Sequence, residues 1–236
     1  MRLAIDIGNT AVKWAAFEGG ELLKSGTARG PGEFAEWTGY TEMLACASGD
    51  TSQLPPSIPL LTPQTPLPIR LDYKTPQTLG ADRVADACGA WALHRGEDCL
   101  VVDAGTCITV DLLTADGTYR GGAIMPGLGM NLQALHTFTA KLPLISLEGV
   151  EKAPVPGRTT EESIVAGTLG ATLLALAGYV TLYRQRCPRL RVLLTGGDAA
   201  RLSAAGSAGW ELQPQLTLIG LNEIMIYNEA EKTNEK

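Results

Sequence analysis

Two segments of the chain share one pattern of apolar and polar positions. An aliphatic run, Leu3-Ala4-Ile5 in the first segment and Leu100-Val101-Val102 in the second, precedes an aspartate, a glycine turn and a threonine. Continuous aliphatic runs are typical of buried strands. A second strand follows each turn, so the pattern predicts two strand-turn-strand units of the same design.

Helical spacing and turn-forming residues predict the other elements. The spacing of apolar residues from Val84 to Trp91 predicts a helix from about Ala81 to Arg95, with Gly96 as its stop. Repeated prolines between residues 54 and 76 exclude a helix there and leave residues 58–61 as at most an edge strand. We also expect strands at residues 21–25, 43–47, 108–113 and 190–194. Further helices are expected from residue 128, at 161–186, near 199 and at 221–227. The polar tail at 228–236 is expected to be mobile.

The order of these elements favours one fold class. Strand meanders followed by helices, occurring twice, are typical of an α/β fold with two similar halves and a central cleft. We expect the halves to be residues 1–96 and 97–236, with ligands bound in the cleft.

Composition narrows the classes of function. The 236 residues are 45% hydrophobic and 19% charged, as in soluble globular proteins. A formal net charge of −6 without any run of Lys or Arg predicts no nucleic-acid partner. Asp6 interrupts the first apolar run, so we expect no signal peptide, no membrane span and a cytoplasmic location. The five cysteines form no C-x-x-C pair and are expected to be reduced core thiols.

The two glycine turns are candidate phosphate-binding loops. Gly8 and Gly105 carry no side chain that would keep a ligand from the main chain. Asp6 and Asp103 would repel a bare phosphate, so their natural role is to hold a cation that bridges to it. A single Asp-x-Gly also occurs in ordinary turns. Its repetition at two strand ends favours a site for a nucleotide and a metal ion.

Five motifs, in their order and spacing over nearly the whole chain, resemble the type III pantothenate kinase family: Asp6-Ile7-Gly8-Asn9-Thr10, Gly80-Ala81-Asp82-Arg83, Asp103-Ala104-Gly105-Thr106, Gly122-Ala123-Ile124-Met125-Pro126-Gly127 and Thr160-Glu161-Glu162-Ser163. The resemblance implies the duplicated actin-like (ribonuclease H-like) ATPase fold of sugar kinases and heat-shock ATPases. It also implies ATP-dependent phosphorylation of pantothenate to 4'-phosphopantothenate, the first committed step toward coenzyme A. Family members are dimers, and the apolar stretch Ile164 to Leu182 is a candidate contact for a homodimer.

The resemblance also implies roles for individual residues. Asp82 is the expected proton acceptor, Asp103 the ligand of a monovalent cation (K⁺ or NH₄⁺), and Asp6 the residue acting through Mg²⁺. ATP contacts are expected from Asp6, Ile7, Gly8, Asn9, Thr10, Ala11, Val12, Lys13 and Thr106. Pantothenate contacts are expected from Tyr73, Gly80, Ala81, Asp82, Arg83 and Thr160.

Several of these residues keep a second interpretation. Lys13 either contacts phosphate or faces solvent, and Arg83 either pairs with the carboxylate of pantothenate or forms a surface ion pair. Asp82 stands in the first turn of a helix, where it can also complement the helix dipole. Thr159 can take the place of Thr160 as the substrate contact. By the same resemblance, the turn Thr195-Gly196-Gly197 stands where related ATPases contact the nucleoside.

Three other functions remain open. Bvg accessory factors, regarded as transcriptional activators, belong to the same sequence family, so a nucleotide-binding regulator is one alternative. The acceptor pocket is not shared across the clan, so a kinase for another small alcohol or sugar is a second. An ATPase that drives movement or assembly is a third, and it would hydrolyse ATP without any acceptor.

Overall fold

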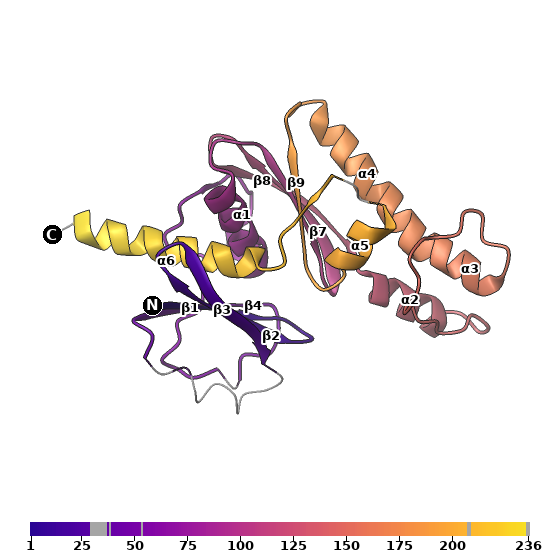
Figure 1. Cartoon of the computed structure of the whole chain (residues 1–236), viewed down its shortest axis with the longest axis horizontal. Helices are drawn as coiled ribbons and strands as arrows, with labels where there is room; N and C mark the ends of the chain where they lie inside the picture. Colours follow the sequence, from indigo (N-terminus) through magenta and orange to yellow (C-terminus); the bar gives the residue numbers. More distant parts are fainter. Residues whose placement is uncertain (29–36, 38, 53, 207–208, 235–236) are drawn as a thin grey trace. The chain divides into compact units, whose positions relative to one another are not determined.

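Figure 1 shows the computed structural model of the chain, which describes residues 1–28, 37, 39–52, 54–206 and 209–234. The chain divides into two compact units. Unit 1 comprises Met1–Glu97, Leu112–Gly121 and Gln215–Lys236, and unit 2 comprises Asp98–Asp111 and Gly122–Pro214. The C-terminal segment thus belongs with the N-terminal sheet. The division into sequence halves at residue 96 stays a prediction.

A four-stranded sheet forms the centre of unit 1. Its strands are β1 (Arg2–Ile7), β2 (Val12–Glu18), β3 (Glu21–Ala28) and β4 (Glu42–Ala47), in the order β3-β2-β1-β4. The first three form an antiparallel meander, and β4 is parallel to β1. Because side chains alternate along a strand, Leu3, Ile5 and Ile7 point to one face, where they pack in a buried apolar cluster with Ala45 and Ile58.

Two helices of unit 1 pack together and on this sheet. Helix α1 (Ala81–Leu93) contacts α6 (Leu216–Asn234) and β4, and α6 also contacts β1. A Cβ atom at Gly220 would lie 1.7 Å from the carbonyl oxygen of Ala85, and one at Gly89 would lie 2.4 Å from that of Leu216. The two glycines therefore allow a close helix crossing.

The expectation of a mobile tail at 228–236 is wrong for residues 228–234, which continue a helix, and residues 235–236 lie outside the described part of the chain. Helix α6 extends through Asn234, well beyond the short helix at 221–227. Gly220, which looked like the residue before the helix, is a packing position inside it. The Arg2 guanidinium pairs with Glu229, which attaches the polar end of the helix to the first strand.

A second sheet repeats the arrangement of the first. Its strands are β5 (Arg70–Leu71), β6 (Cys99–Ala104), β7 (Cys107–Thr114), β8 (Thr118–Pro126), β9 (Arg191–Thr195) and β10 (Glu211–Leu212), in the order β10-β9-β6-β7-β8-β5. As β1 lies between β2 and the parallel strand β4, so β6 lies between β7 and the parallel strand β9. The internal repeat indicated by the two aspartate turns is therefore present in the fold.

The helices of unit 2 follow the predicted positions. They are α2 (Leu128–Thr137), α3 (Thr160–Val165), the π-helical η3 (Ala166–Gly170), α4 (Ala171–Arg184) and α5 (Ala199–Ala205). The run Thr160–Arg184 is long and apolar enough to cross a membrane by length and composition, and 44% of its apolar window is buried in the protein. A core helix of a soluble protein meets the same criteria, so the expectation of no membrane partner stays a prediction.

The proline-rich segment agrees with its expectation, whereas the cysteines need one correction. The proline-rich segment contains the short 3₁₀ helix η2 (Pro76–Thr78) and strand β5, but residues 58–61 form no strand and contribute a single bridge, from Leu60 to Ala45. All five cysteines are free, and Cys107 is exposed, whereas the other four are buried. Cys107 starts the strand after the second aspartate turn, where it stands outside the core.

Candidate functional site

The register of three strands places Asp6 in a row with two other side chains. Asp6 of β1 lies opposite Lys13 of β2 and opposite Cys46 of β4. Partners in register point to the same face of a sheet, and this face is opposite to that of Leu3 and Ile5. Lys13 is half-buried beside Asp6. The arrangement favours the phosphate-contact interpretation of Lys13 over that of an ordinary exposed lysine.

The surroundings of Asp6 suit a bound cation. Burial raises the pKa of the Asp6 carboxyl above its usual value, and Asp82 adds to this, whereas Lys13 and the Cys46 thiol act in the opposite direction. The Cys46 Sγ donates a hydrogen bond to Asp6 Oδ1 over 3.5 Å. Burial, followed by the charges of Asp6 and Asp82, raises the pKa of this thiol well above its usual range. A magnesium ion would compensate the negative charge of the two carboxylates.

The loop after Asp6 is held against the end of β4. Within the loop, the Gly8 amide donates to the Ala11 carbonyl over 3.1 Å. The amides of Ser48 and Gly49 both donate to the Ile7 carbonyl over 3.0 Å. A Cβ atom at Gly49 would lie 2.4 Å from the Gly8 oxygen. Gly49 is thus part of the loop's architecture, and sequence reasoning missed it because its partner is distant along the chain.

Asp82 occupies the first turn of α1, and a glycine makes room for its carboxylate. Asp82 Oδ1 accepts a hydrogen bond from the Arg83 amide over 2.8 Å. A Cβ atom at Gly80 would lie 2.5 Å from this same oxygen. The charge of Asp82 acts on both Asp6 and Cys46. Unit 1 therefore brings the predicted magnesium residue and the predicted proton acceptor into one electrostatic environment.

Two further predicted acceptor residues lie in unit 1. Arg83 is only 6% exposed, which contradicts the alternative of a surface ion pair. Tyr73 follows β5, and its ring lies 6.0 Å from that of Tyr119, centroid to centroid. Gly121, at a φ of +81°, would place a Cβ atom 3.3 Å from the Tyr73 ring. The bare glycine therefore gives this tyrosine its place beside β8.

The second aspartate turn, in unit 2, packs against the glycine turn that follows β9. Asp103 lies in register with Thr195. Gly196 has a φ of +95°, and a Cβ atom there would lie 2.3 Å from Asp103 Oδ1. The Asp198 amide donates to the Ala104 carbonyl over 2.9 Å. The turn Thr195-Gly196-Gly197 is thus directly adjacent to Asp103.

A third segment completes this part of unit 2. The Gly127 amide donates to the Thr106 carbonyl over 3.1 Å. A Cβ atom at Gly127 would lie 2.4 Å from the Thr106 oxygen and 2.5 Å from that of Gly105. The glycine of the Gly122–Gly127 motif therefore serves close packing on the aspartate turn, and the exposed Thr106 stands at that turn.

The described part of the chain holds no cluster of side chains that would bind a metal ion on its own. Across residues 1–28, 37, 39–52, 54–206 and 209–234, no three His, Cys, Asp or Glu side chains lie together as a metal site. Asp6 and Asp103 are each a candidate for a site with one carboxylate. Mg²⁺ is commonly bound in this way, with waters and substrate phosphates as the other ligands.

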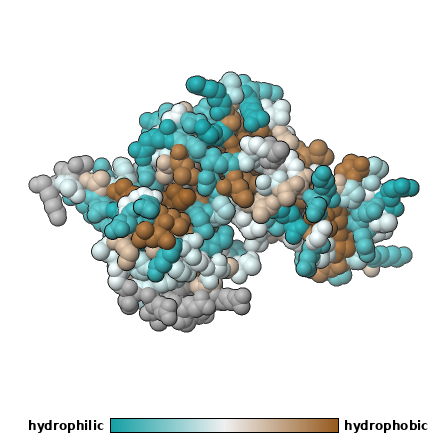
Figure 2. Space-filling model, viewed as in Figure 1, coloured by the Kyte–Doolittle hydropathy of each residue, from teal (hydrophilic) through white to brown (hydrophobic). Residues whose placement is uncertain are grey.

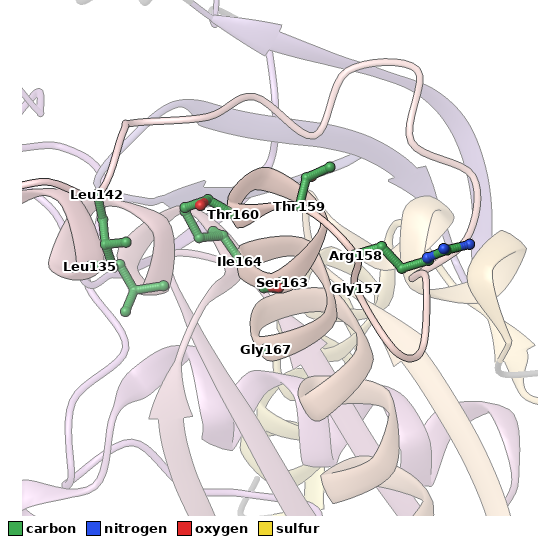
Figure 3. Close-up of a pocket in the computed structure, with 9 residues that line it drawn as sticks. All are labelled: Leu135, Leu142, Gly157, Arg158, Thr159, Thr160, Ser163, Ile164 and Gly167. Atoms are coloured by element: carbon green, nitrogen blue, oxygen red, sulfur yellow. The ribbon is translucent and has the colours of Figure 1, made fainter.

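A pocket of about 680 Å³ lies in unit 2, near the start of α3 (Figure 3), and is lined by Leu135, Leu142, Gly157, Arg158, Thr159, Thr160, Ser163, Ile164 and Gly167. The Thr159 hydroxyl caps the helix by accepting a hydrogen bond from the Glu162 amide over 3.1 Å. In Figure 3, Thr160 and Ile164 point toward Leu135 and Leu142, whereas Thr159 points away. This difference favours Thr160 over Thr159 as the residue that meets a ligand.

Comparison with known proteins decides the family. The family model described as type III pantothenate kinase matches residues 41–181. A type III pantothenate kinase of Phocaeicola vulgatus is 38% identical over 97% of this chain and 99% of its own. The chain belongs to the type III pantothenate kinase family. The resemblance inferred from the five motifs is confirmed, and with it the class of enzyme, a kinase.

Solved structures confirm the fold class. A protein described as a Baf family transcriptional activator, from Campylobacter jejuni, matches with a TM-score of 0.63 at 21% identity and covers 97% of this chain and 99% of its own. The activator of the 2-hydroxyisocaproyl-CoA dehydratase from Clostridium difficile, with bound ADPNP, matches with a TM-score of 0.57 at 14% identity, covering 99% and 97%. At these identities the likeness shows the fold alone, the duplicated actin-like ATPase fold.

The raised pKa of Asp6 predicts that this kinase becomes more stable when the carboxylate is removed. At neutral pH, Asp6→Asn should raise the free energy of unfolding of the ligand-free protein by roughly 0.5–2 kcal/mol, the usual range of stabilising substitutions. A carboxyl whose pKa is raised on folding costs stability when it is ionised, so the difference should shrink as the pH falls toward the usual Asp value. Urea unfolding at several pH values measures it, and a less stable Asn variant at neutral pH would contradict it.

The contact between Gly80 and Asp82 predicts an effect on turnover. Gly80→Ala should displace the Asp82 carboxylate and lower kcat by roughly 10- to 100-fold, because small displacements of reacting groups cost rates of this order. The KM for ATP should change little. Gly20→Ala is the matched control, since a Cβ atom there has nothing within 4 Å. Equal kcat values for the Gly80→Ala and Gly20→Ala variants would show that the gap at Gly80 does not set the position of Asp82.

Proposed function

We propose that this kinase transfers the γ-phosphoryl group of ATP to the primary hydroxyl of pantothenate, which yields 4'-phosphopantothenate and ADP in the first committed step toward coenzyme A. The observation that carries the proposal is that the charge of Asp82 acts on the Asp6 carboxyl within unit 1, on a chain of this family. Phosphoryl transfer to an alcohol needs a proton acceptor and neutralised phosphate oxygens, with positioning supplying most of the rate. The two carboxylates are suited to these two needs.

Asp82 is the proton acceptor in this proposal. As the oxygen of the primary hydroxyl forms its bond to phosphorus, and the bond from phosphorus to the bridging oxygen of ADP breaks, the hydroxyl proton passes to the Asp82 carboxylate. The hydrogen bond from the Arg83 amide and the gap at Gly80 hold that carboxylate at the start of α1.

Asp6 and its loop bind the nucleotide. Asp6 would hold magnesium, which when bound neutralises charge on the β- and γ-phosphate oxygens. The residues from Ile7 to Lys13 contact the phosphates, with the Gly8 turn fixed by Gly49. Thr106 is the contact from the second aspartate turn, and Asp103 holds K⁺ or NH₄⁺ there. Support for this assignment comes from the packing of the Gly127 and Gly196 turns around Asp103 and Thr106.

The pantothenate-binding residues combine a buried cation with polar side chains. The Arg83 guanidinium offers paired donors for the carboxylate of pantothenate. Tyr73, Gly80, Ala81 and Thr160 complete the set. The orientation of Thr160 into its pocket supports its assignment.

A homodimer in the cytoplasm is part of the proposal. On the face that Figure 2 shows, hydrophobic side chains reach the surface in the region of α2 to α4. Leu174 and Leu182 of α4 are 73% and 56% exposed in the single chain. Exposed apolar side chains of this kind favour a contact between subunits. No nucleic-acid partner is proposed, in keeping with the net charge of −6.

An assay of ADP release tests the proposed function. The purified protein with ATP, Mg²⁺ and K⁺ should release ADP when pantothenate is added, and Asp82→Asn should lower kcat by about 100-fold or more while nucleotide binding is kept. Turnover only with another alcohol or sugar would indicate a different acceptor. Hydrolysis without an acceptor would indicate an ATPase, and nucleotide binding without turnover would indicate a regulator. Any of these three outcomes contradicts the proposal.

The two neighbouring threonines at the start of α3 should differ in their roles. Thr160→Val should raise the KM for pantothenate by roughly 10-fold and leave the KM for ATP unchanged, because an unpaired polar group of the ligand costs about that much. Thr159→Val should instead lower the free energy of unfolding by about 1 kcal/mol through loss of the helix cap. Steady-state kinetics and thermal unfolding of both variants separate the two roles. A larger KM effect from Thr159→Val would reverse the assignment.

A further inference from the structure

A cysteine side chain touches the Asp6 carboxylate, and the sheet fixes the position of this cysteine. Cys46 lies in register with Asp6 on the parallel neighbour of β1, and its Sγ is 3.5 Å from Asp6 Oδ1. The whole residue is buried, at 0% exposure. A buried donor aimed at a carboxylate restricts the orientations that the carboxylate can take.

We propose that Cys46 is a positioning residue of this kinase, whose thiol orients the Asp6 carboxylate for the metal-bound nucleotide. The inference rests on the proposed function of Asp6 as the residue that holds magnesium. Hydrogen-bond partners of a metal ligand set its orientation, and their loss commonly weakens metal binding by about 10- to 100-fold. Cys46 itself touches neither the metal nor the reacting atoms.

The internal repeat provides an independent argument. In the second sheet, the residue in register with Asp103 on the parallel strand β9 is Thr195, which is 1% exposed. In each sheet, the residue paired with the aspartate on the neighbouring parallel strand therefore has a small, buried side chain. It is a thiol in the first sheet and a hydroxyl in the second, and either can donate a hydrogen bond. A residue needed only to fill space would not have to be able to donate a hydrogen bond in both copies.

The chain offers a matched control for the loss of a buried thiol. Cys88 lies on α1 in the same unit and is also 0% exposed. Substitution of either cysteine by alanine removes the same atom from the interior, so the general cost of a small cavity should be similar. Only Cys46 donates to Asp6. Comparison of the two alanine variants therefore separates an effect on Asp6 from an effect of packing.

Binding of Mn²⁺ with ADP, followed by the electron paramagnetic resonance signal of free Mn²⁺, tests the proposal without relying on turnover. Cys46→Ala should weaken Mn²⁺ binding in the presence of ADP by roughly 10-fold, whereas Cys46→Ser should stay within about 3-fold of the wild type because the hydroxyl also donates. Cys88→Ala should match the wild type. Equal weakening by Cys46→Ala and Cys46→Ser, or by Cys46→Ala and Cys88→Ala, would overturn the proposal.

The infrared S–H stretching band gives a second readout in the folded wild type. The band of Cys46, assigned from the difference between the wild type and Cys46→Ser, should move to higher wavenumber in Asp6→Asn, because a neutral amide is a weaker acceptor than a carboxylate. An unmoved band would overturn the proposal even if Cys46→Ala fails to fold. Inactivity of the wild type toward pantothenate would contradict the proposed acceptor but would leave both of these readouts intact.

Discussion

The register of β1 with its neighbours β2 and β4 determines how the candidate site is built around Asp6. It sets Lys13 and Cys46 on either side of Asp6, on the sheet face opposite the apolar cluster. A shift of one residue in either pairing would turn these side chains to the wrong face. Burial raises the pKa of Asp6, so its ionised form is costly, and a bound cation would lower this cost. Stability and ligand binding therefore make opposing demands on the same carboxylate.

Glycines at several positions of the candidate site let the main chain and the carboxylates come close together. Gly80 leaves the room that the Asp82 carboxylate occupies, and Gly49 lets the loop after Asp6 rest against the end of β4. Gly127 and Gly196 do the same around the second aspartate turn. Each of these contacts would become a clash with a single added carbon atom. The motifs of this family thus include glycines that leave room for neighbouring atoms and take no part in the reaction themselves.

Local pattern predicted most of the fold, because the strands and helices are set by the spacing of neighbouring residues. The repeated aspartate turns indicated the duplication, and α1 lies almost where its apolar spacing placed it. Contacts between distant segments could not be predicted. Nothing near Gly220 in the sequence shows that Ala85 packs on it, so the start of α6 was misplaced. Likewise, Cys46 looked like an ordinary core thiol until the register set it beside Asp6.

The proposed mechanism requires the start of α1 to present a proton acceptor to pantothenate while Asp6 faces the metal-bound nucleotide. A crystal structure with a non-hydrolysable ATP analogue, Mg²⁺ and pantothenate tests it most directly. We expect a carboxylate oxygen of Asp82 about 2.6–3.2 Å from the primary hydroxyl oxygen, the range for proton transfer. Pantothenate bound with that hydroxyl out of reach of Asp82, or magnesium bound away from Asp6, would contradict it.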